Sequence, residues 1–131
     1  MKVAIIGSKD WQSRRKIQEV LTRLKQMDEP ITILGQGGKE GAPLMVKKYA
    51  LEFGMNYAEF NPSYTGRNLY SAMPDTYYGK AYHFSQLIHR MTLIANACDK
   101  MLILVNGPLD PQLEAAYKRA KKLEKSIVIL E

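Results

Sequence analysis

The stretch Val3-Ala4-Ile5-Ile6-Gly7 decides the fold, because the chain repeats its pattern twice. The repeats read ITILG at residues 31–35 and MLILVNG at residues 101–107. An apolar run followed by a flexible turn and a helical pattern is typical of a buried strand in a parallel sheet. The turn then lies at the carboxyl end of the strand, where open α/β sheets bind ligands. Glycine lets a ligand approach the backbone closely, and the next helix directs unpaired N–H groups at it. The three turns therefore predict an anion site, with phosphate as the favoured anion.

The rest of the chain alternates between strand and helix patterns. Strands are predicted at residues 2–6, 31–34, 56–60, 100–105 and 126–130, and helices at residues 12–27, 43–53, 80–97 and 111–124. This alternation predicts an α/β fold, in which a single three-layer Rossmann-like domain covers residues 1–131 around a five-stranded, mostly parallel sheet. An irregular, tyrosine-rich insertion interrupts the pattern at residues 61–79. Its rings either stack on a base above the site or serve as amphipathic packing.

The order of the strands determines which turns meet. Right-handed crossovers leave few orders, and we favour 3-2-1-4-5. The winding then reverses between the first and fourth strands, so the turns that follow them face each other across a cleft, and the turn after the second strand flanks both. The predicted ligand-binding residues come from these turns: Gly7, Ser8, Lys9, Asp10, Trp11, Gly37, Gly38, Lys39, Gly41, Asn106 and Gly107.

Two charged residues on helices are candidates to complete the site. Arg90 lies off the apolar stripe of its helix, so its guanidinium would hold a phosphate if that side faced the cleft; otherwise it is an exposed arginine. Glu114 lies in the first turn of the helix after the fourth strand. A carboxylate there either complements the helix dipole or acts as a catalytic group on a glycosidic bond.

Composition narrows the class of protein. The net charge of +6 favours anionic partners, although the lysines at residues 118–125 fall on the side of a helix that needs solvent, so nucleic acid is a possible partner and not the favoured one. A single cysteine, Cys98, excludes an internal disulfide. No apolar segment is long enough to span a membrane. We expect a cytoplasmic protein without cofactor, metal site or membrane partner, and homo-oligomerisation stays open.

Three motifs resemble one family over nearly the whole chain. They are G-S-K-D-W at residues 7–11, G-G-K-E-G-A at residues 37–42 and H-R-M-T-L-I-A-N-A-C-D at residues 89–99, followed by a strand, a glycine and Glu114. The arrangement resembles the SLOG superfamily, and within it the YspA-like proteins. It is similar to the LOG nucleoside monophosphate phosphoribohydrolases and to the DNA-processing A proteins, which bind single-stranded DNA. The resemblance implies a nucleotide-type pocket lined by Lys9, Gly37, Gly38, Arg90 and Glu114.

The turn after the fourth strand departs from the LOG pattern. LOG proteins read P-G-G-x-G-T-x-x-E, whereas residues 105–114 read V-N-G-P-L-D-P-Q-L-E and keep one glycine and the final glutamate. The first hypothesis is therefore a module that binds or senses a nucleotide-derived ligand. The alternative is an N-glycosidic hydrolase or deoxyribosyltransferase with Glu114 as the acting carboxylate and Arg90 as phosphate clamp. A third hypothesis is single-stranded nucleic-acid binding.

Overall fold

A parallel five-stranded sheet forms the centre of the molecule, in the order β3-β2-β1-β4-β5. The structure, a computed structural model, describes residues 1–38, 40–60 and 84–131, without the side chains of residues 84–86. The strands are β1 (Lys2–Gly7), β2 (Thr32–Gly35), β3 (Asn56–Glu59), β4 (Lys100–Leu104) and β5 (Ser126–Leu130). All four neighbouring pairs are parallel, so the predicted fold class and strand order are confirmed.

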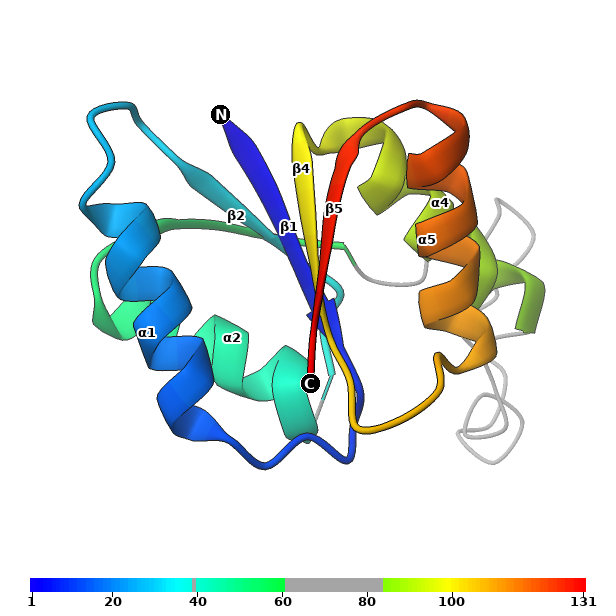
Figure 1. Cartoon of the computed structure of the whole chain (residues 1–131), viewed down its shortest axis with the longest axis horizontal. Coiled ribbons are helices and arrows are strands. Elements are labelled where there is room, and N and C mark those ends of the chain that lie inside the picture. The colour runs from blue at the N-terminus through cyan, green and yellow to red at the C-terminus, as the bar shows by residue number, and fades with distance from the viewer. Residues whose placement is uncertain (39, 61–83) are drawn as a thin grey trace, which may run out of the picture.

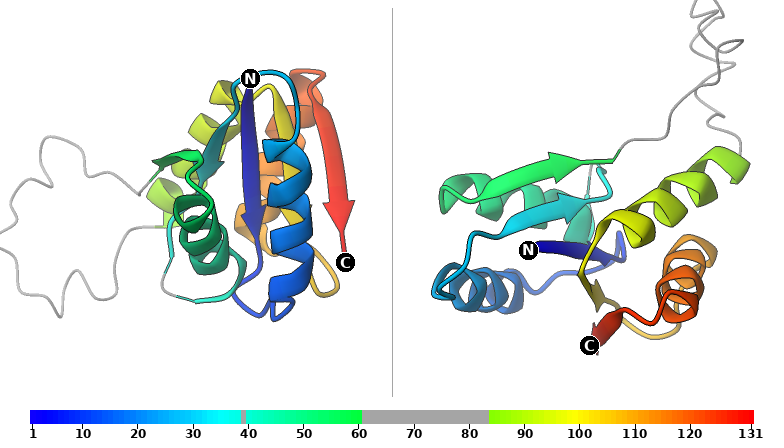
Figure 2. Two further views of the ribbon diagram at one scale, coloured as in Figure 1. Left: turned by 90° about the vertical axis from the view of Figure 1, so that its left-hand side faces the viewer. Right: turned by 90° about the horizontal axis from the view of Figure 1, so that it is seen from above.

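Helices cover both faces of this sheet (Figures 1 and 2). They are α1 (Arg14–Lys25), α2 (Gly41–Glu52), α4 (Phe84–Ala97) and α5 (Pro111–Lys122). The helices α1 and α2 cover one face, and α4 and α5 cover the other. The expected insertion at residues 61–79 and the expected helical start at residues 80–83 lie outside the described residues.

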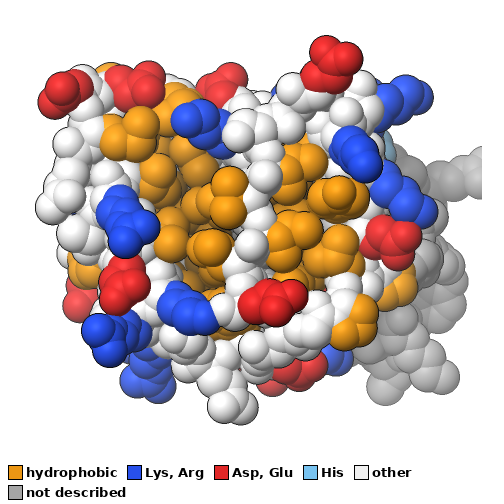
Figure 3. Space-filling model, in the orientation of Figure 1, with side chains coloured by type: hydrophobic (Ala, Val, Ile, Leu, Met, Phe, Trp, Pro, Cys, Tyr) orange, Lys and Arg blue, Asp and Glu red, His pale blue; other side chains and the backbone are white. Residues whose placement is uncertain are grey.

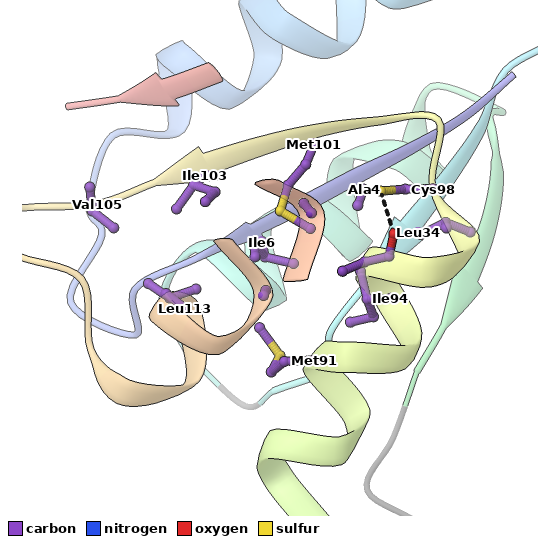
Figure 4. Close-up of a cluster of buried hydrophobic side chains, with 13 residues drawn as sticks. Ala4, Ile6, Leu34, Met91, Ile94, Cys98, Met101, Ile103, Val105 and Leu113 are labelled. Carbon is purple, nitrogen blue, oxygen red and sulfur yellow. Dashed lines mark hydrogen bonds between the residues drawn. The ribbon is translucent and has the colours of Figure 1, made fainter. Parts of the chain in front are cut away.

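The alternation of side chains along β1 explains the two cores. Val3 and Ile5 point toward α1 and α2, while Ala4 and Ile6 point toward α4 and α5. Figure 4 shows the second core, in which Met91, Ile94 and Leu113 meet Ile6 and Ile103. Burial on both faces is why these strands are continuous apolar runs without a polar alternation.

Side-chain caps mark the starts of two helices, α1 and α5, at the carboxyl edge of the sheet. Ser13 Oγ accepts from the Lys16 N–H at the start of α1. Asp110 caps α5, with Pro111 in its first position. The helix α2 starts at Gly41, two residues before the predicted start at Pro43. The starts of α1, α2 and α5 therefore gather around the edge where β1 and β2 end.

Candidate functional site

A hollow of about 230 Å³ lies at the carboxyl ends of β1 and β2. It includes five of the residues that the sequence predicted, and these come from three segments far apart in the chain. The residues that line it are Gly7, Lys9, Gln36, Gly37, Gly38, Glu40, Pro43, Arg90, Asp110 and Gln112. The expectation that the glycine turns gather at one edge is therefore met for the turns after β1 and β2.

Glycine is required where α2 approaches the turn after β1. Gly41 has a φ of 70°, and a Cβ there would overlap the backbone of Lys9. A Cβ on Gly7 would come within 2.6 Å of the Ala42 Cβ. The Ala42 N–H donates to the carbonyl oxygen of Ser8 over 3.0 Å. The N-terminus of α2 thus packs against this turn and fixes Lys9 at the side of the hollow.

Gln36, directly after β2, is a buried polar residue that joins three elements. Its side-chain Oε1 accepts from the Gly7 N–H over 2.8 Å, and its carbonyl oxygen accepts from Arg90 Nη1 over 2.7 Å. Arg90 Nη2 donates to Gln112 Oε1 in the first turn of α5 over 2.6 Å. Arg90 is only 9% exposed, so it is not a surface arginine. Its guanidinium connects α4 to the end of β2 and to α5 at one side of the hollow.

Charges of both signs surround the hollow. Lys9 and Arg90 supply positive charge, and Glu40 and Asp110 supply negative charge. Asp110 Oδ1 accepts from the Leu113 N–H over 2.8 Å, so this carboxylate is directed at the N-terminus of its own helix. Glu40 occupies the corresponding position before α2, without a side-chain capping bond. The positive ends of two helix dipoles thus face the same hollow and offset the two carboxylates.

The turns after β1 and β4 do face each other, as the strand order predicted. Asn106 Nδ2 donates to the carbonyl oxygen of Asp10 over 3.1 Å and joins them. The Asp10 N–H donates to Ser8 Oγ over 3.1 Å. Asn106 and Asp10 therefore join the two turns, Ser8 stabilises the turn after β1, and none of the three lines the hollow.

Three further candidates, Trp11, Gly41 and Gly107, do not line the hollow. Trp11 is 2% exposed in the core beside α1, with its indole N–H donating to the Ser13 carbonyl oxygen, because a ring this large is stabilised by burial. Gly41 has the packing role described above. Gly107 is exposed, with a φ of 96°. Lys39 lies outside the described residues.

Glu114 lies on the exposed side of α5. Its Oε1 forms an ion pair with Lys118 Nζ one turn later, at 2.9 Å, and its side chain is 49% exposed. It does not line the hollow. Lys118 follows at the i+4 position, the spacing at which oppositely charged side chains pair on a helix surface. The structure thus separates the two candidate catalytic residues, because Arg90 borders the hollow and Glu114 does not.

The sequence reading missed Gln36, Glu40, Pro43, Asp110 and Gln112 as lining residues. The Asp110-Pro111 pair is a signal for a helix start, and this helix was predicted to start at Pro111. Gln36 directly follows an apolar strand, a position at the ligand-binding edge. Gln112 carries no such signal, because its contact with Arg90 depends on how α4 and α5 pack.

Within the described ranges, no group of three or more His, Cys, Asp or Glu side chains is placed to hold a metal ion. No helix in those same ranges is long and apolar enough to cross a membrane.

Comparison with known proteins gives a likeness of fold. The chain matches no protein-family model and no curated protein. It is similar to the X-ray structure of DNA processing protein A (DprA) from Streptococcus pneumoniae, with a TM-score of 0.74 and 14% sequence identity. The match covers 99% of this chain and 50% of the DprA chain, so this chain spans about half of that protein's length. The chain has a Rossmann-like fold similar to that in DprA.

Proposed function

We propose that the hollow binds the phosphate of a nucleotide-type ligand. The observation that carries this proposal is the convergence of Gly7, Gly37 and Gly38 with Lys9 and Arg90 in one hollow at the carboxyl edge of the sheet. Glycine backbone admits a phosphate closely, and the starts of α2 and α5 add favourable dipoles. The resemblance of the three motifs to SLOG proteins, in particular the YspA-like ones, supports the same assignment.

The size and charge of the hollow favour a small phosphorylated group. Its volume of about 230 Å³ lies below the range of about 300 to 1,000 Å³ that is usual for small-molecule pockets. A phosphate with its sugar fits such a volume better than a whole dinucleotide. The carboxylates of Glu40 and Asp110 would repel a chain of several phosphates, whereas their oxygens can accept bonds from sugar hydroxyls. We therefore favour a nucleoside monophosphate whose base lies outside the hollow.

Binding without turnover is favoured over hydrolysis at the N-glycosidic bond. The carboxylate that a LOG-like reaction would use, Glu114, is exposed and paired with Lys118. A general acid or base must reach the reacting atoms within hydrogen-bond distance. Asp110, which lines the hollow directly before α5, already accepts a bond from the Leu113 N–H of that helix.

The test is a calorimetric titration of the protein with the four nucleoside monophosphates, and separately with inorganic phosphate and a nucleoside. We expect saturable binding of at least one monophosphate, and weaker binding of phosphate or nucleoside alone. Lys9→Ala should weaken the binding about tenfold or more, because one charge-assisted hydrogen bond contributes about 1.5 to 3 kcal/mol. Chromatography of the same mixtures should show no free base.

The matched control is Lys2→Ala, which removes the same charge from the exposed opposite end of β1. It should bind as the wild type does. If Lys9→Ala and Lys2→Ala weakened binding equally, the binding would depend on the net charge of the protein and not on the hollow, which would contradict the proposal. So would a titration in which no monophosphate binds. Release of free base that Glu114→Gln abolishes would support the hydrolase instead.

Single-stranded nucleic acid is a second candidate ligand, favoured by the structural similarity to a DNA processing protein. Two exposed cations follow β1: Lys9, which lines the hollow, and Arg14, the first residue of α1. They would continue a phosphate path from the hollow onto the surface. The net charge of +6 would assist association with any polyanion.

Fluorescence anisotropy with a labelled oligothymidylate at several salt concentrations tests this candidate. Binding should weaken steeply with salt, and a Lys9→Ala/Arg14→Ala variant should bind more weakly with a shallower slope, by about 0.7 for each lost phosphate contact. Lys121→Ala/Lys122→Ala removes the same charge from the last turn of α5 and is the control. Binding insensitive to salt, or equal losses in the two variants, would contradict this candidate.

A further inference from the structure

The strand β5 ends the sheet with an open backbone edge in the part of the chain that the structure describes. The Val105 N–H donates to the Leu130 carbonyl oxygen over 3.0 Å, so the backbone groups of Leu130 face β4. By the alternation along a strand, those of Val128 also face β4, and those of Ile127 and Ile129 face away from the sheet. Such a row of outward N–H and C=O groups is a template for pairing with another strand.

Both faces of this edge strand are apolar. Ile127 packs against the core beneath α4 and α5, and Leu130 packs against the core beneath α1. Val128 and Ile129 are 45% and 43% exposed, on opposite faces. Figure 3 shows hydrophobic side chains gathered on both sides of β5. Edges that stay in water are usually blunted by charge or proline, and residues 126–130 contain neither.

An apolar groove of about 240 Å³ extends this surface on the side of α1. It runs between α1 and the two strands β4 and β5, and the side chains that line it include Val20, Leu24, Met27, Val128 and Leu130. The basic residue at its border, Arg23, is exposed. The open backbone edge and the groove therefore form one continuous surface around β5.

We infer that this surface pairs with β5 of a second copy of the chain, antiparallel and about a twofold axis through Val128. The backbone groups of Ile127 and Ile129 point away from the sheet. Ile127 of one copy would therefore exchange two backbone hydrogen bonds with Ile129 of the other copy, and Val128 would lie directly opposite Val128 of the other copy. The two sheets would join into one of ten strands. The two grooves would lie side by side on one face of it.

The charges at the ends of β5 favour this arrangement. Lys125 precedes the strand and Glu131 follows it. The Lys125 ammonium donates to the carbonyl oxygens of Asn96 and Cys98 in its own chain, which fixes a positive charge at this end of the strand. Antiparallel pairing about Val128 places each Lys125 opposite the Glu131 of the other copy, whereas parallel pairing would place like charges together. Moving the axis to Ile127 would place Lys125 opposite Ile129, and moving it to Ile129 would place Ile127 opposite Glu131. The strand is thus complementary to itself in one register.

The test measures the mass of the protein in solution by light scattering and analytical ultracentrifugation over the micromolar range. We expect a dimer for the wild type. Val128→Lys places two positive charges together on the axis and should give a folded monomer. Leu51→Lys, at a 57% exposed position on α2, is the matched control and should stay dimeric. Circular dichroism of both variants checks that they fold.

A second variant tests the register directly. Directly opposed residues of this non-hydrogen-bonded kind have Cα atoms about 4.5 Å apart, which a disulfide can span. Val128→Cys should therefore form a covalent dimer on mild oxidation, while Leu51→Cys should not. A monomeric wild type would overturn the inference, and so would a dimer that Val128→Lys leaves intact. Failure of Val128→Cys to crosslink in a dimer would overturn the register.

Discussion

At the scale of single residues, Arg90 has the clearest physical role. Its guanidinium donates to the Gln36 carbonyl oxygen and to Gln112 Oε1, and Gln36 in turn holds the Gly7 N–H. These contacts hold the ends of β1 and β2 in place relative to α4 and α5. The residue that the sequence suggested as a phosphate clamp therefore also organises the hollow, and the proposed site depends on its fold-stabilising contacts.

This role predicts a large loss of stability for Arg90→Ala. The substitution leaves the buried Gln36 carbonyl oxygen without its charged donor, and a hydrogen bond to a charged group contributes about 1.5 to 3 kcal/mol, so the free energy of unfolding should fall by about 3 kcal/mol. Arg90→Lys should recover only part of this, because a lysine lacks the fork that reaches both oxygens. Urea unfolding followed by circular dichroism measures the changes.

Arg119→Ala provides the matched control. Arg119 also connects α5 to α4, through a 2.8 Å bond from its Nε to Asn96 Oδ1, but this bond is exposed. Its loss should change the free energy of unfolding by about 0.5 kcal/mol or less. If Arg90→Ala were as stable as Arg119→Ala, the connecting role of Arg90 would be wrong.

Some residues of the candidate site could be predicted from the sequence, and others could not. Gly7, Gly37, Gly38 and Lys9 were predictable because they follow apolar strands, and local order alone places such turns at the ligand-binding edge. Gln112 was not predictable, since it meets Arg90 only through the packing of two helices. Trp11 was misleading for a related reason: the turn carries it beside the site, but its side chain folds back into the core.

At the scale of elements, the strands and their order followed from the apolar runs and the handedness of crossovers. The structure confirms all five strands within one residue at each end. Helix ends were less certain, since α2 begins at Gly41 with a φ of 70° and not at Pro43. That start depends on the close approach of α2 to Lys9, a contact between separate segments that a local pattern does not encode.

The strand β5, in contrast to the start of α2, was predicted correctly from its local sequence. Its apolar run SIVIL was read correctly as a strand, because burial and β-branched residues both favour that structure. The same run on an interior strand would be covered on both sides. At the edge it leaves Val128 and Ile129 exposed. The predicted strand order already placed this strand last, but its apolar run alone is the same as that of a strand buried on both faces.

At the scale of the whole molecule, two protonated groups, the buried Cys98 thiol and the half-buried Tyr57 hydroxyl, connect stability to pH. Burial is the main cause that raises the pKa of the Cys98 thiol, and the nearby Lys125 partly opposes it. Burial, followed by the negative charge of Glu59, raises the pKa of the Tyr57 hydroxyl, which donates to Glu59 Oε1 over 3.2 Å. The folded chain therefore favours the neutral form of both groups.

The sign of the effect follows from proton binding. In the unfolded chain a cysteine ionises near about pH 8.5 and a tyrosine near about pH 10, whereas the folded chain keeps both protons to higher pH. Above about pH 8.5 the folded state thus binds more protons, and the free energy of unfolding must fall as pH rises. The slope is at most about 1.4 kcal/mol per pH unit for each retained proton.

Urea unfolding of the reduced protein between about pH 7.5 and about pH 10.5 measures this decline across both unfolded pKa values. Cys98→Ala should be less stable at neutral pH but should lose less stability between about pH 8.5 and about pH 10, because it has no thiol to ionise on unfolding. Tyr57→Phe should flatten the later part of the curve, above about pH 10. Equal slopes for the wild type and Cys98→Ala would show that the buried thiol is not what makes the fold sensitive to alkaline conditions.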